Sequence, residues 1–436
     1  MTTVMTQPTG GAADATPVSI PPTIYQRLGV RPVINGAATL TRLGGSLMPP
    51  SVVAAMQEAA AAFVPLDKLQ AAAGRRLAEL TRNEAAYVCS GAAAGLVLAT
   101  AACITGTDAE KMALLPRPDR IKDGKHKVVV FRSQRNGYDF AVRQVGIDLV
   151  EVGPTRTQAM AQAPDEERLA DELFEAIDER TACVTFFAGG HYSAGALALQ
   201  KTVELAHAHG VPVVVDAAAQ VPPVENLWQF SGGPGPRPWA EALFRQGLAP
   251  KPSGETDLVG ADLAIFSGGK GLCGPQGSGL IVGRADLITA VGRQGNPNAL
   301  IGRPMKVGKE EICGLVAAVE WYLSLDYDAL ARQYEDQVRR VMDAVSGMTG
   351  VVTERVWPSE AGQPMPRALI RLASEAALTR DALQQALLAH EPPIEVSSAG
   401  QDGIYVNPQT LQSGEEEIIA AALRHALTTR TPAGAV

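Results

Sequence analysis

The sequence has few cysteines and histidines and no long apolar segment. Its five cysteines are widely spaced and include no Cys-x-x-Cys pair, which argues against a disulfide framework and favours a reduced, cytoplasmic location. The six histidines form no metal-ligand pattern, so we expect no bound metal. No apolar run approaches the roughly 18 residues of a membrane span, and the first residues lack the basic start of a secretion signal. We therefore expect no membrane partner.

Positive charge is also scarce. Lys and Arg total 38 against 46 Asp and Glu, and the resulting net charge of −8 argues against a nucleic-acid partner. Hydrophobic residues make up 46% of the chain, an ordinary share for a globular protein. A chain of 436 residues is too long to fold around one simple hydrophobic core, so we expect one large domain and a smaller one.

The apolar pattern predicts an α/β fold. Residues 1–23 are rich in Thr, Pro, Gly and Ala, and we expect them to be disordered. From about Glu84 onward, short apolar strands alternate with amphipathic helices, which is typical of a mainly parallel central sheet with helices on both faces. This large domain is expected over residues 24–325, including an N-terminal arm. Its strands are expected at 87–89, 127–131, 148–152, 182–187, 211–215, 263–266 and 279–283, and helices at 50–62, 69–80, 92–104, 166–177 and 199–209.

Residues 326–436 are expected to form a small C-terminal α+β domain. A long helix begins near Asp326, and strands are expected near 368–372 and 403–406. The last helix opens at Ser413-Gly-Glu-Glu416, the spacing of a capping box. The Gly/Pro-rich stretch at 231–258 is expected to form a surface excursion near the mouth of the site.

Lys270 and Asp216 are the most informative residues of the chain. Lys270 lies in Ser267-Gly-Gly-Lys-Gly271, a small turn on which an amine can reach an aldehyde carbon without steric hindrance. Asp216 follows the apolar strand at 211–215, where a carboxylate can keep a ring nitrogen protonated. A Schiff-base amine and a pyridinium partner are the two groups that pyridoxal phosphate requires.

Each of the two residues also has a simpler interpretation. Lys270 would otherwise be a solvated lysine on a glycine-rich turn, and Asp216 an ordinary helix N-cap. A nucleotide-binding P-loop is excluded, because Ala264 stands where that motif needs Gly and Gly271 where it needs Ser or Thr. The occurrence of both residues, each among small neighbours, favours the cofactor.

Further segments fit the same cofactor. Ser90-Gly91-Ala92 follows a short strand and opens a helix, so its backbone N–H groups can approach a phosphate, although most such turns are only N-caps. The hydroxyl of Ser267 can bind that phosphate or cap the turn. Ala218 is small enough for a flat ring to lie against the backbone, and Gln134, after the strand at 127–131, is placed to cover the ring.

These motifs carry a resemblance to the fold-type I pyridoxal phosphate superfamily. Within it, the chain resembles the bacterial selenocysteine synthase-like group and, most closely, the D-glucosaminate-6-phosphate ammonia-lyase-like proteins. The resemblance covers roughly residues 25–427 and is most specific around Lys270 and Arg303. The matching stretches are 33–45, Tyr87-Val-Cys-Ser-Gly-Ala-Ala-Ala94, Gly137-Tyr-Asp139, Asp216-Ala-Ala-Ala-Gln-Val-Pro-Pro223, Ser267-Gly-Gly-Lys-Gly271 and Gly302-Arg-Pro-Met-Lys-Val-Gly-Lys-Glu310.

The resemblance implies a fold and a set of roles. The fold is that of the aspartate aminotransferase-like, PLP-dependent transferases. Lys270 is implied to be the Schiff-base lysine and Asp216 the pyridinium partner, with Ser267 and residues 90–92 around the cofactor phosphate. A homodimer or larger homo-oligomer with the site at a subunit interface is implied as well.

Arg303, Lys306 and Lys309 are the best candidates for binding an anionic substrate. Three cations within seven residues can hold a carboxylate or a phosphate through charge-assisted bonds. The alternative is a solvated helix start before Glu310. Arg42 and Arg135 are weaker candidates for the same task, and His191, which follows the strand at 182–187, is a candidate for the pocket wall.

The sequence thus predicts a PLP-dependent enzyme that acts on an amino acid or an amino-sugar acid. The favoured reaction is α,β-elimination with ammonia release from a 2-amino-3-hydroxy acid, with or without a phosphate. Lys270 would take the α-proton, which requires that burial or nearby cations lower its pKa from the usual value of about 10.4. Aldolases, racemases and aminotransferases use the same residues, and a selenocysteine synthase-like aminoacyl-tRNA transferase is an alternative. A binding protein that has lost catalysis is a third hypothesis.

Overall fold

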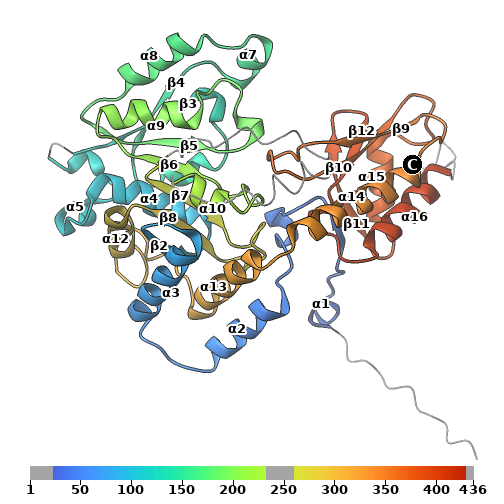
Figure 1. Cartoon of the computed structure of the whole chain (residues 1–436), viewed down its shortest axis with the longest axis horizontal. Coiled ribbons are helices and arrows are strands. Elements are labelled where there is room, and N and C mark those ends of the chain that lie inside the picture. Colours follow the sequence, from blue (N-terminus) through green and yellow to red (C-terminus); the bar gives the residue numbers. More distant parts are fainter. Residues whose placement is uncertain (1–22, 123, 232–259, 429–436) are drawn as a thin grey trace, which may run out of the picture.

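The computed structural model describes residues 23–122, 124–231 and 260–428, which form two lobes (Figure 1). The predictions for the N-terminal tail and for the insert at 231–258 lie outside these residues, except at Thr23 and Ser231. Within the described ranges, no helix combines the length and the apolar character needed to cross a bilayer.

The larger lobe is built on a seven-stranded sheet with the order β2-β8-β7-β6-β5-β3-β4. The strand β8 runs antiparallel to both of its neighbours, and the other adjacent pairs are parallel. The predicted mainly parallel sheet is therefore confirmed. Its strands are β2 (Ala85–Cys89), β3 (Lys127–Phe131), β4 (Asp148–Val152), β5 (Thr181–Phe187), β6 (Val213–Asp216), β7 (Leu263–Ser267) and β8 (Gly279–Gly283).

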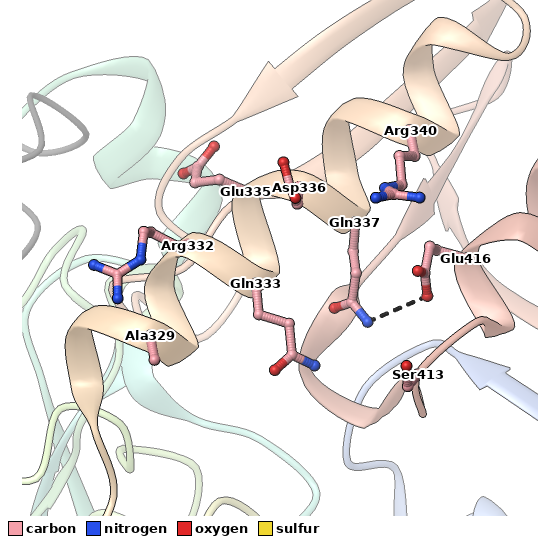
Figure 2. A pocket seen from close by; sticks show the side chains of 9 residues that line it. All are labelled: Ala329, Arg332, Gln333, Glu335, Asp336, Gln337, Arg340, Ser413 and Glu416. Atoms are coloured by element: carbon pink, nitrogen blue, oxygen red, sulfur yellow. Dashed lines mark hydrogen bonds between the residues drawn. The ribbon is translucent and has the colours of Figure 1, made fainter.

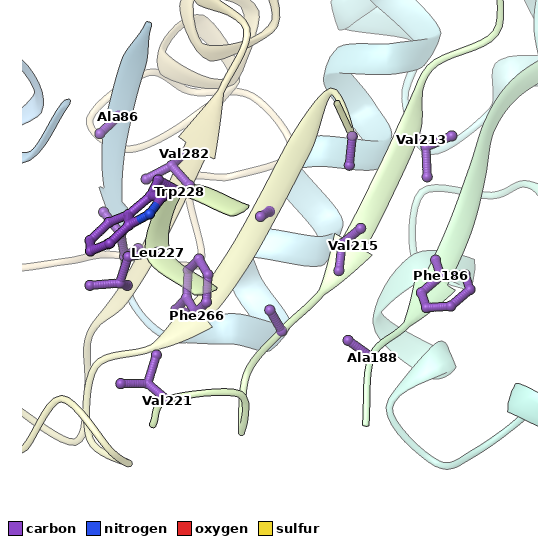
Figure 3. Close-up of a cluster of buried hydrophobic side chains, with 14 of the residues drawn as sticks. Ala86, Phe186, Ala188, Val213, Val215, Val221, Leu227, Trp228, Phe266 and Val282 are labelled. Atoms are coloured by element: carbon purple, nitrogen blue, oxygen red, sulfur yellow. The ribbon is translucent and has the colours of Figure 1, made fainter. Parts of the chain in front are cut away.

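Side-chain alternation along these strands divides the core into two layers. Val213 and Val215 of β6 lie in the cluster packed on α3, α8, α9 and α13, whereas Val214 lies in the cluster packed on α4, α6 and α12. Figure 3 shows part of the first cluster, with Phe186 and Phe266 on strands to either side of β6. Because helices cover both faces, the strands are continuously apolar, as the sequence predicted. The helices of this lobe are α2 (Pro50–Ala60), α3 (Leu66–Thr81), α4 (Ala92–Thr105), α5 (Ala109–Leu114), α6 (Asp139–Arg143), α7 (Arg156–Ala161), α8 (Glu166–Ala176), α9 (Leu199–Ala208), α10 (Asn226–Gln229), α12 (Ala285–Gln294) and α13 (Lys309–Leu323).

The smaller lobe contains a five-stranded sheet with the order β1-β11-β12-β10-β9. Helices α14 to α16 surround a separate core that includes Val338, Ile370 and Leu423. The strand β1 comes from the N-terminal segment, which the sequence assigned to the large domain, and it pairs in parallel with β11. The division at residue 325 stays a prediction. The elements are α1 (Ile24–Arg27), β1 (Ile34–Gly36), α14 (Tyr327–Asp343), β9 (Val351–Val356), β10 (Arg367–Leu372), α15 (Arg380–Leu388), β11 (Ile394–Ala399), β12 (Gly403–Val406) and α16 (Glu415–Thr428).

The start of α16 differs from the predicted capping box. The Glu416 carboxylate accepts a hydrogen bond from the N–H of Gly414 at 3.1 Å, and the Glu415 carboxylate accepts one from the N–H of Gln412 at 2.8 Å. A capping box requires Glu416 to accept from Ser413 instead. Acidic side chains thus satisfy the turn before the helix, and their charge also suits its N-terminus.

Candidate active site

Asp216 and Lys270 lie at the same edge of the large sheet. Asp216 is the last residue of β6, where it pairs with Phe187 of β5 and Ile265 of β7. Lys270 lies in the turn that joins β7 to β8. Parallel strands end at one edge of their sheet, so the two residues meet where α/β sheets bind ligands.

Tight packing fixes the turn that carries Lys270. A Cβ atom added at Gly271 would lie 1.8 Å from the carbonyl oxygen of Val221, so the turn is pressed against the segment that follows Asp216. Nζ of Lys270 lies 6.0 Å from the centre of the Tyr138 ring. Burial lowers the pKa of Lys270, and the charge of Asp216 opposes this shift only in part. The amine therefore loses its proton more readily than a surface lysine, which suits attachment to an aldehyde and proton removal.

Asp216 is almost fully buried, with 8% of its surface exposed. Its Oδ1 atom accepts a hydrogen bond from the N–H of Ala218 at 2.9 Å. Burial raises the pKa of Asp216, while the bond from Ala218 and the charge of Lys270 act in the opposite direction. A carboxylate held through one oxygen can place the other against a protonated ring nitrogen.

Residues 90–92 form a turn that suits a phosphate group. Gly91 has a φ of 138°, and no side chain of the described residues caps the N-terminus of α4 there. Gly279 fits so closely that an added Cβ would lie 2.6 Å from the carbonyl carbon of Gly91. Gly279 also pairs with Ser267 of β7, which brings that hydroxyl to the same corner. The N–H groups at the start of α4 and this hydroxyl can bind one anion together.

The cofactor candidates also share one face of the sheet. Val214, two positions before Asp216, and Ile265, two positions before Ser267, both belong to the cluster packed on α4. Because side chains alternate along a strand, Asp216 and Ser267 point to the α4 side. The residues present therefore fit a ring held at Asp216 and a phosphate held at the start of α4.

Gln134, predicted to cover the ring, is fully buried after β3. Its Oε1 atom accepts a hydrogen bond from the N–H of Phe187 at 3.0 Å, which fixes the end of β5 next to Asp216. Its Nε2 atom is buried without a partner among the described residues. The side chain therefore holds the strand end and retains one donor for a ligand.

A cavity of about 470 Å³ opens beside Lys270. The N-terminal segment lines it through Ser46 and Met48, and α13 and α14 line it through Tyr322 and Gln333. A groove of about 670 Å³ lies between α14 and the start of α16, and Gln333 lines it as well. Figure 2 shows the side chains that line this groove. The cavity and the groove thus adjoin at Gln333.

The three predicted substrate cations do not line the cavity at Lys270. Arg303 and Lys306 are exposed, and Arg303 contacts the side-chain oxygen of Asn296 at 3.5 Å. Lys309 donates a hydrogen bond to the carbonyl oxygen of Ala59 at 2.7 Å and also pairs with Glu310. Lys309 therefore holds the last turn of α2, and the role of all three in substrate binding stays a prediction.

The weaker cation candidates have carboxylate partners. Arg42 pairs with Glu395 of β11 at 2.5 Å. Arg135 pairs with Asp139 at 2.5 Å and also with Glu151. These partners neutralise both arginines in the isolated chain, so neither offers an uncompensated charge to a ligand.

The structure brings forward residues near His191 that the sequence analysis did not single out. Nδ1 of His191 lies 2.9 Å from the carbonyl oxygen of Glu360, and its ring centre lies 3.9 Å from that of Tyr192. The guanidinium of Arg156 lies over the other ring of this pair, 4.9 Å from the centre of Tyr192. Tyr138, whose ring lies near Lys270, belongs to the stretch Gly137-Tyr-Asp139 that carries the family resemblance, and this stretch was the available sequence signal.

Known proteins resemble this chain over most of its length. It is 32% identical to D-glucosaminate-6-phosphate ammonia lyase of Salmonella typhimurium over 411 residues, which cover 92% of this chain and 97% of the relative. It is 31% identical to 5'-C-glycyluridine monooxygenase-decarboxylase of a Streptomyces species, with 92% and 88% covered. A solved structure of D-glucosaminate-6-phosphate ammonia-lyase superposes with a TM-score of 0.74 at 30% identity, with 94% of this chain and 100% of that chain covered.

The fold and these relatives show a pyridoxal phosphate-dependent enzyme of fold type I. The chain belongs to the family described as SelA: L-seryl-tRNA selenium transferase, which matches residues 33–335. The selenocysteine synthase-like resemblance drawn from the sequence is thereby confirmed.

Proposed function

We propose that this chain is a PLP-dependent lyase that releases ammonia from a 2-amino-3-hydroxy acid, either an amino acid or an amino-sugar acid. The observation that carries the proposal is the half-buried Lys270 and the buried Asp216 at one sheet edge, with the start of α4, which no described side chain caps, at the same edge. The 32% identity to an ammonia lyase over 92% of the chain supports the reaction class.

Bound pyridoxal phosphate would supply an electron sink for the charge that develops at the α-carbon. Lys270 would carry the cofactor and then take the α-proton at Nζ, for which its lowered pKa is suited. Asp216 would hold the ring nitrogen in its protonated form. Loss of the α-proton and of the β-hydroxyl as water, followed by hydrolysis, gives ammonia and a 2-keto-3-deoxy acid.

The remaining predicted residues would hold the cofactor and the substrate. Ser267 and residues 90–92 would bind the phosphate, and Ala218 and Gln134 would border the ring. Arg303, Lys306 and Lys309 would bind an anionic substrate in an assembly where another subunit completes the site. Apolar side chains support such a homodimer or larger homo-oligomer, because Phe63 is 103% exposed and Leu47, which lines the cavity at Lys270, is 69% exposed.

The proposal also covers organisation and location. We propose a large PLP-binding domain over residues 24–325, a small domain over 326–436 and a cytoplasmic enzyme. Reduced cysteines support that location, since the described chain has five free cysteines and no disulfide.

An assay of ammonia release tests the reaction. Purified protein loaded with pyridoxal phosphate is incubated with a panel of 2-amino-3-hydroxy acids, each with and without a terminal phosphate. We expect ammonia and an equal amount of keto acid from at least one member. Turnover that yields an aldehyde, an amino-group transfer or a change of stereochemistry without ammonia would replace the lyase by an aldolase, an aminotransferase or a racemase.

A second candidate is an aminoacyl-tRNA transferase, which the matching family and a 26% identical L-seryl-tRNA(Sec) selenium transferase of Solidesulfovibrio magneticus favour. The net charge of −8 opposes it, because tRNA binding requires a basic surface. A gel-shift titration with total tRNA at increasing salt separates the two candidates. We expect no shift, and a salt-dependent shift would favour the transferase.

A further inference from the structure

We propose that Arg156 binds an oxyanion of the substrate beside the Lys270 site, with its guanidinium held in place by Ser133 and Tyr192. This inference rests on the proposed function and adds the residue that recognises the acid group. A carboxylate is present in every amino acid and a phosphate only in phosphorylated ones, so the experiment below separates these two sources.

The fold brings Arg156 to the ligand edge of the sheet. Arg156 follows β4, Ser133 follows β3 and Tyr192 follows β5, all at the edge where Asp216 ends β6. The ring centres of Tyr192 and Phe187 are 6.0 Å apart, and Phe187 is the direct neighbour of Asp216 in the β5–β6 pair. Arg156 is thus connected to the cofactor residues through two packed rings.

The guanidinium is fixed in one orientation. Nε and Nη2 of Arg156 both donate hydrogen bonds to the carbonyl oxygen of Ser133 at 3.2 Å, and the group lies 4.9 Å from the centre of the Tyr192 ring. These contacts occupy one edge and one face of the group. The other edge, formed by Nη1 and the second hydrogen of Nη2, matches a carboxylate or a phosphate with two parallel bonds.

Arg156 also differs from neighbouring arginines in its charge balance. Arg132 pairs with Glu151, and Arg135 pairs with Asp139 and Glu151. Among the described residues, no carboxylate lies within ion-pair distance of Arg156, whose charged group instead contacts a carbonyl and a ring. An anionic ligand would therefore find in Arg156 a cation that no described carboxylate balances.

His191 packs in the same cluster as this cation. Its ring centre lies 3.9 Å from that of Tyr192, with 44° between the two ring planes, and Arg156 lies over the same Tyr192 ring. Burial lowers the pKa of His191, and the charges of Arg156 and Lys270 lower it further, while the contact with Glu360 opposes the shift. Both cations therefore act electrostatically on the same imidazole.

Binding and kinetics of Arg156→Met and Arg156→Lys test the proposal, with Arg168→Met on the exposed surface of α8 as the matched control. For a substrate that releases ammonia, we expect KM to rise about 10- to 100-fold in Arg156→Met, because the substrate loses a charged hydrogen-bonding partner. The change in kcat should be smaller. Arg156→Lys keeps the positive charge but loses the planar guanidinium with its two parallel N–H donors. Its KM should therefore lie between those of the wild type and Arg156→Met. Arg168→Met should match the wild type.

A second measurement does not need turnover. Thermal unfolding of the protein is recorded with a 2-hydroxy acid that carries only a carboxylate and, separately, with inorganic phosphate. If Arg156 binds the carboxylate, the hydroxy acid stabilises the wild type and not Arg156→Met; if it binds a phosphate, inorganic phosphate does so instead. If neither probe distinguishes the wild type from Arg156→Met, the inference is overturned, even where ammonia release succeeds. If ammonia release fails but a probe stabilises the wild type and not Arg156→Met, the proposed function is overturned and anion binding by Arg156 still holds.

Discussion

Ser267 faces Gly279 across the antiparallel pair of β7 and β8, and Gly279 in turn lies directly against the backbone of Gly91. A hydroxyl near the lysine turn and the start of α4 thereby reach one corner, although they come from distant parts of the chain. This close approach requires that residue 279 has no side chain, so a substitution of Gly279 tests the arrangement.

Gly279→Ala is expected to weaken cofactor binding. The new methyl group would lie 2.6 Å from the carbonyl carbon of Gly91 and 2.9 Å from Sγ of Cys89, so the phosphate turn must shift. We expect the Kd for pyridoxal phosphate, measured by absorbance titration, to rise at least about tenfold, with a loss of about 1–3 kcal/mol of stability. Gly277→Ala is the control, because nothing lies within 4 Å of its added Cβ. Equal binding by the two variants would contradict the assignment of the phosphate site.

Asp216→Asn is expected to abolish most turnover without loss of stability. Asn keeps an oxygen that can accept from the N–H of Ala218, but it cannot hold a ring nitrogen protonated by charge. We expect kcat to fall by roughly 100-fold or more. Because burial raises the pKa of Asp216, removal of its charge should leave the melting temperature of the cofactor-free protein equal or higher. A variant with normal kcat would remove Asp216 from the mechanism.

The lowered pKa of Lys270 predicts a pH dependence of stability. Between this lowered pKa and the ordinary value of 10.5, the folded protein binds fewer protons at Lys270 than the unfolded chain does. The contribution of Lys270 to the free energy of unfolding therefore rises with pH through that window and falls as pH decreases. Denaturant titrations of the cofactor-free protein should show this rise in the wild type relative to Lys270→Met. A difference that stays constant with pH would mean that the amine is solvated.

Arg303→Ala is expected to affect the substrate and not the fold of the chain. The Arg303 side chain is exposed, and its polar contact among the described residues is with Asn296, so its loss should change stability by less than about 0.5 kcal/mol. If it binds substrate in an assembly, KM for an anionic substrate should rise about tenfold. Arg293→Ala, an exposed arginine on α12, is the control. An unchanged KM would leave the anion site to Arg156.

Much of the large sheet could be predicted from the sequence, because its buried strands are unbroken apolar runs. Val213 to Val215 form such a run, and Asp216 at its end marks the ligand edge. The strand β9 could not be foreseen, since Glu354 and Arg355 interrupt its apolar pattern at an exposed edge of the small sheet. The pairing of β1 with β11 depends on contacts between distant segments, which no local pattern encodes.

The candidate site, like the fold, could be predicted from the sequence only in part. Lys270 and Asp216 stand in distinctive local motifs, and the structure places both at one sheet edge. Arg156 lies in an ordinary polar helix start, and only its contacts with Ser133 and Tyr192 distinguish it. Conversely, the cluster at 303–309 has a distinctive sequence, yet Lys309 is engaged with Ala59 and Glu310. Local composition identifies charges, whereas only the fold determines which of them lack partners.

The lysine that carries the cofactor can be identified by locating the covalently bound pyridoxal phosphate. Protein incubated with pyridoxal phosphate is reduced with sodium borohydride, digested and analysed by mass spectrometry, alongside Lys270→Ala and the exposed control Lys201→Ala. We expect a phosphopyridoxyl group on the peptide that contains Lys270 in the wild type and in Lys201→Ala, and none in Lys270→Ala. A label on another lysine, or a wild type that takes up no cofactor, would contradict this expectation.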